Sequence, residues 1–148
     1  MSSISIELED INKPDAWQLI HELSTVLEGI TGSSGKNSFN LDEMLSPRSI
    51  FVLARAEGKA VGCVAIRPLD EKTGEMKRMY AKEKGVGAKL LAFIEGQAKR
   101  LDYSTIVLET RMINQQAVRF YEKHGYTRIE NYGKYIGRTE AICFEKKI

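Results

Sequence analysis

The chain has 148 residues, of which 43% are hydrophobic and 28% are charged, as expected for one globular domain. Its 22 basic and 20 acidic residues nearly cancel to a net charge of +2. This balance argues against a nucleic-acid binder, because phosphate contacts need a concentrated basic face. The start MSSISIELED lacks the basic and apolar regions of a signal peptide, and no apolar run approaches the ~20 residues that span a bilayer. We therefore expect a cytoplasmic protein without membrane contact.

The two cysteines, Cys63 and Cys143, both lie in apolar, strand-like sequence. We expect two buried thiols in a reducing compartment. Neither these cysteines nor the histidines His21 and His124 have the spacing of a metal site. The residue pattern therefore speaks against a zinc enzyme, and we expect no metal.

The N-terminal part begins with a strand pattern and continues with a helical one. Residues 3–9 alternate between apolar and polar side chains, which predicts a half-buried strand. A helix is expected from Pro14 to about Glu28, because proline suits the first turn and apolar residues recur at helical spacing.

The segment from Gly29 to Asn40 is rich in glycine and serine and is predicted to be a loop. Long loops in compact domains are often functional, so this segment is a candidate part of a site. A short helix is expected at Leu41–Leu45, ending before Pro47.

The rest of the chain alternates between short strand patterns and two helical patterns. Strands at 50–56 and 60–66 flank a turn that contains glycine, which is typical of a hairpin. Further strands are expected at 74–81, 104–110, 126–131 and 139–146, and helices at 86–101 and 115–124. This order predicts one α/β domain with a central sheet.

The junction KRMYAKEKGVGAKLL places a basic, glycine-containing turn between a strand and a helix. Gly85 and Gly87 have no side chains, so backbone N–H groups at the helix start can approach a ligand closely. These groups carry the positive end of the helix dipole, and Lys82, Lys84 and Lys89 add charge, so a pyrophosphate fits there. An ordinary turn is the alternative for this pattern alone. The GxGxxG and GK[ST] patterns of NAD and ATP sites are missing.

The sequence resembles the GNAT superfamily of acyl-CoA-dependent N-acyltransferases over nearly its whole length. The run EMKRMYA…KGVGAKLLAFIE is similar to the family's cofactor-binding motif, [RQ]xxGx[GA]. The run LETRMINQQAVRFYEKHGYTRI is similar to its next segment, NxxAxxxYxxxGF. Asn114, Ala117, Tyr121 and Gly125 occupy that spacing, with Tyr126 in place of phenylalanine.

The chain departs from the family pattern just before the glycines. Family members usually carry several more residues there, whereas this chain has only Ala81–Lys84. Lys82 stands where arginine or glutamine is expected, and Glu83 places an acid beside the phosphates. The shorter loop makes the pyrophosphate contact at Lys82 less secure than that at Gly85–Ala88.

The resemblance implies one GNAT domain over residues 1–148. Its sheet would be mixed and mostly antiparallel, with six to seven strands, about four flanking helices, and the fourth and fifth strands splayed apart. It also implies that acetyl-CoA, as co-substrate, gives its acetyl group to a primary amine of a small molecule in a ternary complex. A protein or peptide acceptor and a non-catalytic acyl-CoA sensor are the alternatives, and a homodimer is left open.

The resemblance also implies roles for residues of this chain. The residues expected to bind the cofactor are Met79, Tyr80, Ala81, Lys82, Lys84, Gly85, Val86, Gly87, Ala88, Lys89, Asn114, Ala117 and Tyr121. A backbone N–H at 79–81 would polarise the thioester carbonyl, and Tyr121 would protonate the departing thiolate. The alternatives are a helix cap for Asn114, which is compatible with cofactor contact, and a core position for Tyr121.

An amine with a pKa near ~10 must lose a proton before it attacks, which calls for a carboxylate base. Glu75, on the strand beside the cofactor, is the first candidate, and Glu109, on the next strand, is the second. For both, a solvated or paired strand residue is the alternative.

The acceptor pocket is expected to be shaped by the Gly29–Asn40 loop and by the last hairpin, with Tyr132, Tyr135 and Arg138. Arg138 could bind a carboxylate with two hydrogen bonds, which would suit an acceptor that resembles an amino acid. A surface arginine in a turn is the alternative.

Overall fold

A seven-stranded mixed sheet forms the centre of the protein, in the order β1-β2-β3-β4-β5-β7-β6. The structure is a computed structural model, and it describes residues 3–32 and 44–148. The strands are β1 (Ile4–Leu8), β2 (Ile50–Ala56), β3 (Lys59–Pro68), β4 (Thr73–Ala81), β5 (Thr105–Arg111), β6 (Thr127–Ile129) and β7 (Ala141–Lys147). The α-helices are α1 (Pro14–Thr31), α2 (Val86–Arg100) and α3 (Gln115–Lys123). The described residues thus have three α-helices, against the predicted four or so.

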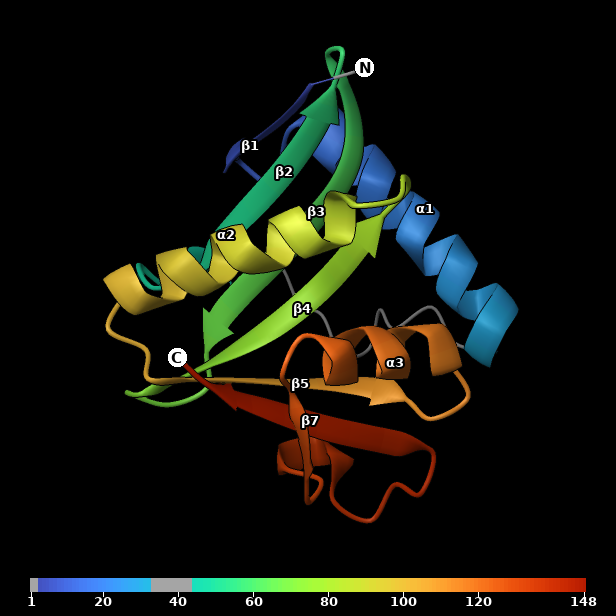
Figure 1. The fold of residues 1–148 in the computed structure, drawn as a ribbon, viewed down its shortest axis with the longest axis vertical. Helices are drawn as coiled ribbons and strands as arrows, with labels where there is room; N and C mark the ends of the chain where they lie inside the picture. Colours follow the sequence, from blue (N-terminus) through green and yellow to red (C-terminus); the bar gives the residue numbers. More distant parts are fainter. Residues whose placement is uncertain (1–2, 33–43) are drawn as a thin grey trace.

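Helices cover both faces of the sheet (Figure 1). Helix α2 packs Leu90 and Ile94 against Val52 and Ile66 of β2 and β3, and the aromatic residues of α3 extend the same cluster. Helix α1 covers the opposite face with a second cluster that contains Leu19. Cys63 and Cys143 are buried free thiols, as predicted.

Close packing of α2 on β3 depends on Gly62. A Cβ atom at Gly62 would lie 2.7 Å from the Val86 side chain and 2.8 Å from the Tyr80 carbonyl oxygen. The missing side chain therefore lets the first turn of α2 lie directly on the sheet.

Helix α1 is longer than its sequence pattern predicts. Gly29, Ile30 and Thr31, for which the sequence predicts a loop, are helical, and the helix ends at Gly32 in the left-handed conformation (φ +80°). Ile30 continues the apolar spacing, and the Gly32 N–H donates to the Glu28 carbonyl, so the C-cap lies three residues later than predicted. The rest of that loop, and residues 41–43 of the predicted short helix, lie outside the described residues.

Strands β4 and β5 are the parallel pair of the sheet, and they pair only at their beginnings. Thr73 pairs with Thr105 and Glu75 with Val107, where the pairing ends. Beyond that point the two strands diverge, as Figure 1 shows. The predicted splay of the fourth and fifth strands is therefore confirmed.

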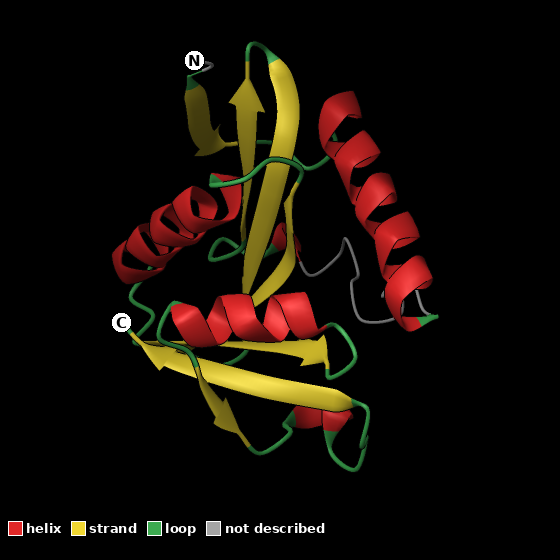
Figure 2. Cartoon of the chain, turned by 45° about the vertical axis from the view of Figure 1, so that its right-hand side comes forward, coloured by secondary structure: helices red, strands yellow, loops and turns green. Residues whose placement is uncertain are grey.

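Figure 2 shows how the helices stand beside the diverging strands, with α1 on one side and α3 close to β5. None of the helices in the described part of the chain is long and apolar enough to cross a membrane.

Candidate active site

The divergence of β4 and β5 opens a cavity of about 460 Å³. Its walls come from both strands, from the C-terminal half of α1, from α3 and from residues 134–138. The predicted residues Met79, Tyr80 and Ala81 line it, and so do Asn114, Ala117 and Tyr121. Two sequence segments that were assigned to one site thus meet in one cavity.

A bulge in β4 lies on the wall of this cavity. Cys63 pairs with Tyr80 and Ala65 with Lys77, so Arg78 and Met79 lie opposite the single residue Val64. Arg78 has a φ of +55°, which is unusual for a residue with a side chain. Such a bulge bends the strand and removes residues from the regular ladder. It therefore turns the backbone of β4 just where the predicted thioester contact lies.

The N-terminus of α2 lies at the end of β4, where the pyrophosphate is expected. Gly85 is the N-cap, with φ +87°, and no atom of the described residues lies within 4 Å of the position its Cβ would take. No side chain caps this helix end, and its first turn contains no acidic residue. Open space and uncapped N–H groups therefore fit a pyrophosphate at Gly85–Ala88.

Lys82 and Gly87 have contacts of their own near this helix end. The Lys82 Nζ lies 3.0 Å from a carboxylate oxygen of Glu22 on α1. A Cβ at Gly87 would lie 3.3 Å from the Phe120 ring, so α2 and α3 approach each other closely here. Gly87 lines the cavity, whereas the segment Lys82–Val86 and Lys89 do not.

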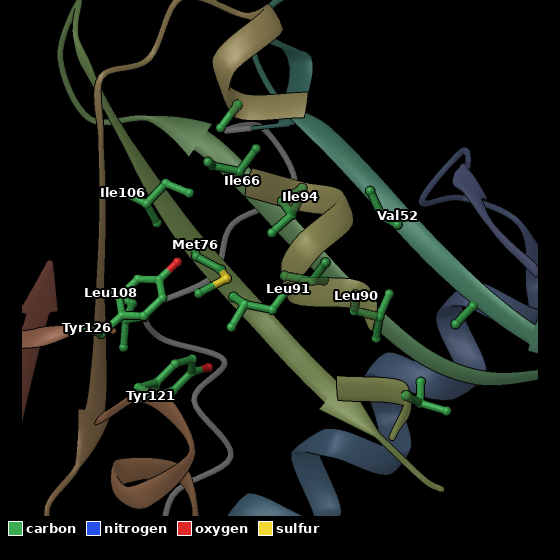
Figure 3. Close-up of a cluster of buried hydrophobic side chains, with 14 of the residues drawn as sticks. Val52, Ile66, Met76, Leu90, Leu91, Ile94, Ile106, Leu108, Tyr121 and Tyr126 are labelled. Atoms are coloured by element: carbon green, nitrogen blue, oxygen red, sulfur yellow. The ribbon is translucent and has the colours of Figure 1, made fainter. Parts of the chain in front are cut away.

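Helix α3 presents three predicted residues to the cavity. The Asn114 side chain accepts a 3.4 Å hydrogen bond from the Ala117 N–H and so caps the helix, which confirms its cap role. Tyr121 is 8% exposed and packs edge-on against Phe120 and Tyr126. Burial raises the pKa of Tyr121, so its hydroxyl keeps its proton at neutral pH. In Figure 3 this hydroxyl points to the side on which β4 runs.

The two candidate carboxylates lie in different environments. Glu75 is 1% exposed and does not line the cavity. It forms an ion pair of 2.5 Å with Arg67 and accepts a 2.6 Å hydrogen bond from the Tyr132 hydroxyl. Lys77 Nζ lies 3.5 Å from Oε2, the oxygen that accepts from Tyr132. Glu75 is therefore held by partners within the protein.

Glu109 does line the cavity, although its side chain is only 11% exposed. Its Oε2 atom is buried without a hydrogen-bond partner among the described residues, and the nearest cation, the Arg111 Nε, is 3.8 Å away. Burial raises the pKa of the Glu109 carboxyl, against the opposing effect of Arg111 and Lys77. A buried carboxylate oxygen without a donor is costly, which often marks a functional group.

Several cavity residues were not predicted from the sequence. Lys77 lines the cavity and donates a 2.8 Å hydrogen bond to Tyr135, and burial lowers its pKa. Arg78 is 9% exposed and donates to Ser24 of α1 at 3.4 Å. In the sequence, Lys77 and Arg78 look like ordinary residues of an alternating strand. The bulge beside them has no sequence signature, so their place in the cavity wall could not be predicted. Leu23 and Leu27 of α1 also line the cavity, although their helical spacing in the sequence indicates only an apolar helix face.

The last hairpin reaches the cavity in part. Arg138 and Tyr135 line it, as expected, together with Lys134. Tyr132 does not line it and instead holds Glu75. Among the described residues, no group of three or more histidine, cysteine or acidic side chains has metal-binding geometry.

Comparison with known proteins gives consistent results. Residues 17–126 match the model of the Acetyltransferase (GNAT) family. The chain is 29% identical to an IAA acetyltransferase of Azospirillum brasilense, over the full length of both. It is 28% identical to a proposed acyl-CoA N-acyltransferase of Klebsiella pneumoniae, with a TM-score of 0.81 and 97% of each chain covered. A GNAT family acetyltransferase of Elizabethkingia anophelis, solved with acetyl-CoA bound, shares the fold at 20% identity, with a TM-score of 0.73 and 98% of each chain covered.

Proposed function

Because the chain belongs to the GNAT acetyltransferase family, we propose that it transfers the acetyl group of acetyl-CoA to a primary amine of a small molecule by direct attack in a ternary complex. One observation carries this proposal. The cavity between β4 and β5 brings strand backbone, the Tyr121 side chain and the Glu109 carboxylate to one space. Its volume, about 460 Å³, is in the range of small-molecule sites.

Acetyl-CoA would supply a thioester, whose carbonyl carbon is the electrophile. The backbone of Met79–Ala81 lies free of β5, since the pairing of the two strands ends at Glu75. That backbone would bind the pantetheine arm, and an N–H of the bulge would polarise the thioester carbonyl. The uncapped N–H groups at Gly85–Ala88 would bind the pyrophosphate, with Lys82, Lys84 and Lys89 adding charge.

Glu109 is the better placed of the two candidate bases. Its carboxylate reaches the cavity, and the nearest cation among the described residues, Arg111, lies 3.8 Å away. The two oxygens of Glu75 instead contact Arg67 at 2.5 Å and Tyr132 at 2.6 Å. The raised pKa of Glu109 makes its carboxylate a stronger base than an ordinary glutamate. Glu109 would therefore take a proton from the acceptor ammonium, directly or through a water molecule.

Tyr121 would act on the leaving group. Its buried hydroxyl keeps its proton at neutral pH because burial raises its pKa. It would donate a hydrogen bond, and then the proton, to the sulfur as negative charge develops on it. Both catalytic groups project from elements that the hydrophobic core fixes, β5 and α3.

Acetyl-CoA-dependent release of free thiol, measured over a panel of small amines, tests this function. We expect release with at least one amine and stabilisation of the protein by CoA. Stabilisation by CoA without turnover of any amine would favour an acyl-CoA sensor, and turnover of peptides alone would favour a protein acceptor. Either result would contradict a small-molecule acceptor, and failure to bind CoA would contradict the cofactor itself.

A further inference from the structure

The cavity carries an excess of positive charge. Among the residues that the structure describes, a single carboxylate, that of Glu109, lines it. The cationic side chains that line it are Lys77, Arg78, Arg111, Lys134 and Arg138. A site that binds a positively charged acceptor would gain little from such a lining, because like charges repel within a few ångströms.

Internal carboxylates account for only part of this charge. Arg111 pairs with Glu140 at 2.9 Å and approaches Glu109, while Lys77 lies 3.5 Å from Glu75. Lys134 and Arg138 form no ion pair with any residue that the structure describes, and Arg138 acts on Glu140 only at longer range. Lys134 also acts electrostatically on Lys77, since after burial it is the main effect that lowers the Lys77 pKa. An anion beside these cations would therefore be stabilised.

The phosphates of CoA do not explain this charge, because they are expected at the far end of β4. Lys77 precedes Ala81 by four strand residues, which correspond to about 13 Å. Lys134 and Arg138 belong to the segment before β7, next to Tyr135, which bonds to Lys77. These two cations, which have no ion pair among the described residues, thus lie at the acceptor end of the cavity.

The opposite wall of the cavity is apolar. Helix α1 contributes an i, i+3, i+4, i+7 stripe to the lining, namely Leu23, Val26, Leu27 and Ile30. Val26 and Ile30 remain 41% and 39% exposed, although they are large apolar side chains in a helix with a buried face. A ligand with an apolar group would cover them.

Resting on the proposed acetyl transfer, we propose that the acceptor amine also carries a carboxylate and an apolar group, as an apolar amino acid does. Lys134 and Arg138 hold the carboxylate, the α1 stripe contacts the apolar group, and the amine faces Glu109. The amine nitrogen bonds to the acetyl carbon as the carbon–sulfur bond breaks. Of the two protons that the ammonium loses, one leaves through Glu109 to solvent before the attack. The other, released from the nitrogen as the carbon–sulfur bond breaks, replaces the proton that Tyr121 gives to the thiolate, so the tyrosine is restored.

Phenylalanine and phenylalaninamide test this proposal, because they share the amine and the ring but differ in negative charge. We expect kcat/KM for phenylalanine to exceed that for the amide by about tenfold or more. In the double variant Lys134→Gln, Arg138→Gln, the KM for phenylalanine should rise about tenfold while the KM for the amide changes little. Arg128→Gln, an exposed arginine of β6 outside the cavity lining, is the matched control.

Turnover of the amide at least as fast as that of phenylalanine would overturn the carboxylate proposal and leave acetyl transfer intact. A KM for phenylalanine that is the same in the double variant as in the wild type would also overturn the carboxylate proposal. If no amine is turned over, calorimetry of N-acetylphenylalanine and its amide with the CoA-loaded protein still decides the question. Tighter binding of the charged compound supports the proposal, and equal binding contradicts it.

Discussion

Tyr132 donates a 2.6 Å hydrogen bond to Glu75 on β4, and no such bond reaches Glu109 on β5 from the described residues. With Tyr132 and Arg67 bound to it, Glu75 is part of a closed internal network. Glu109 has no comparable donors among the described residues and faces the cavity. Of the two carboxylates on these neighbouring strands, Glu75 is held by internal partners and Glu109 is open to a ligand in the cavity.

Glu109→Gln should remove most of the activity without unfolding the protein. Loss of a general base lowers kcat by about 10²- to 10⁴-fold. Circular dichroism should show an unchanged fold, and Glu130→Gln, an exposed glutamate outside the cavity lining, should keep wild-type kcat. A Glu109→Gln variant with kcat within a few-fold of wild type would remove Glu109 from the mechanism.

Glu75→Gln should mainly lower stability. The change leaves Arg67 and Lys77 without their buried counter-charge, and breaking such a pair costs about 3 kcal/mol. Urea unfolding at neutral pH measures this loss, and kcat measured well below the new midpoint should stay within about tenfold of wild type. A stable Glu75→Gln protein without activity would point to Glu75 as the base.

The pH dependence of Glu109 gives a prediction with a definite sign. Its folded-state pKa is raised above the ordinary value of 4.5, so kcat/KM should fall as the pH drops through that raised pKa. A raised folded pKa means that Glu109 favours folding at low pH and that this contribution is lost as the pH rises. The stability of Glu109→Gln relative to wild type should therefore increase from about pH 4 to about pH 8. A constant difference would show that the carboxyl is not shifted.

Tyr121→Phe should lower kcat by about 10²-fold, because it removes the proton donor to the sulfur, while CoA binding is retained. Tyr126→Phe is a matched control in the same aromatic cluster, since the Tyr126 hydroxyl donates to Glu95 and does not line the cavity. It should lose about 1 kcal/mol of stability and keep its kcat. Equal kcat values for the two variants would contradict a special role for Tyr121.

Ala88→Asp should separate CoA binding from stability. Ala88 is exposed in the first turn of α2, where a negative charge stabilises the helix by about 0.3–1 kcal/mol. The same charge should repel a pyrophosphate and weaken CoA binding by about tenfold or more in calorimetry. Ala88→Asn, of the same shape and neutral, should bind CoA nearly as wild type does. Unchanged affinity in Ala88→Asp would place the pyrophosphate elsewhere.

Much of the fold could be predicted from the sequence, because strand alternation, helical spacing and glycine positions are local signals. The sequence predicts the end of α1 too early, because Gly29 is a typical helix-terminating residue. In the structure the left-handed C-cap is Gly32. The sequence ranks Glu75 above Glu109 as the candidate base, and the structure reverses this ranking. The reason is that Arg67 and Tyr132, which are distant from each other in sequence, both contact Glu75 in the folded protein. The bulge at Arg78 likewise follows from strand pairing that no local pattern shows.

A crystal structure with CoA bound tests the central claim most directly. We expect the pantetheine arm between β4 and β5, the pyrophosphate at Gly85–Ala88, and the sulfur within about 3.5 Å of the Tyr121 hydroxyl. CoA bound outside the cleft between these strands, or a sulfur beyond the reach of Tyr121, would contradict the proposed site.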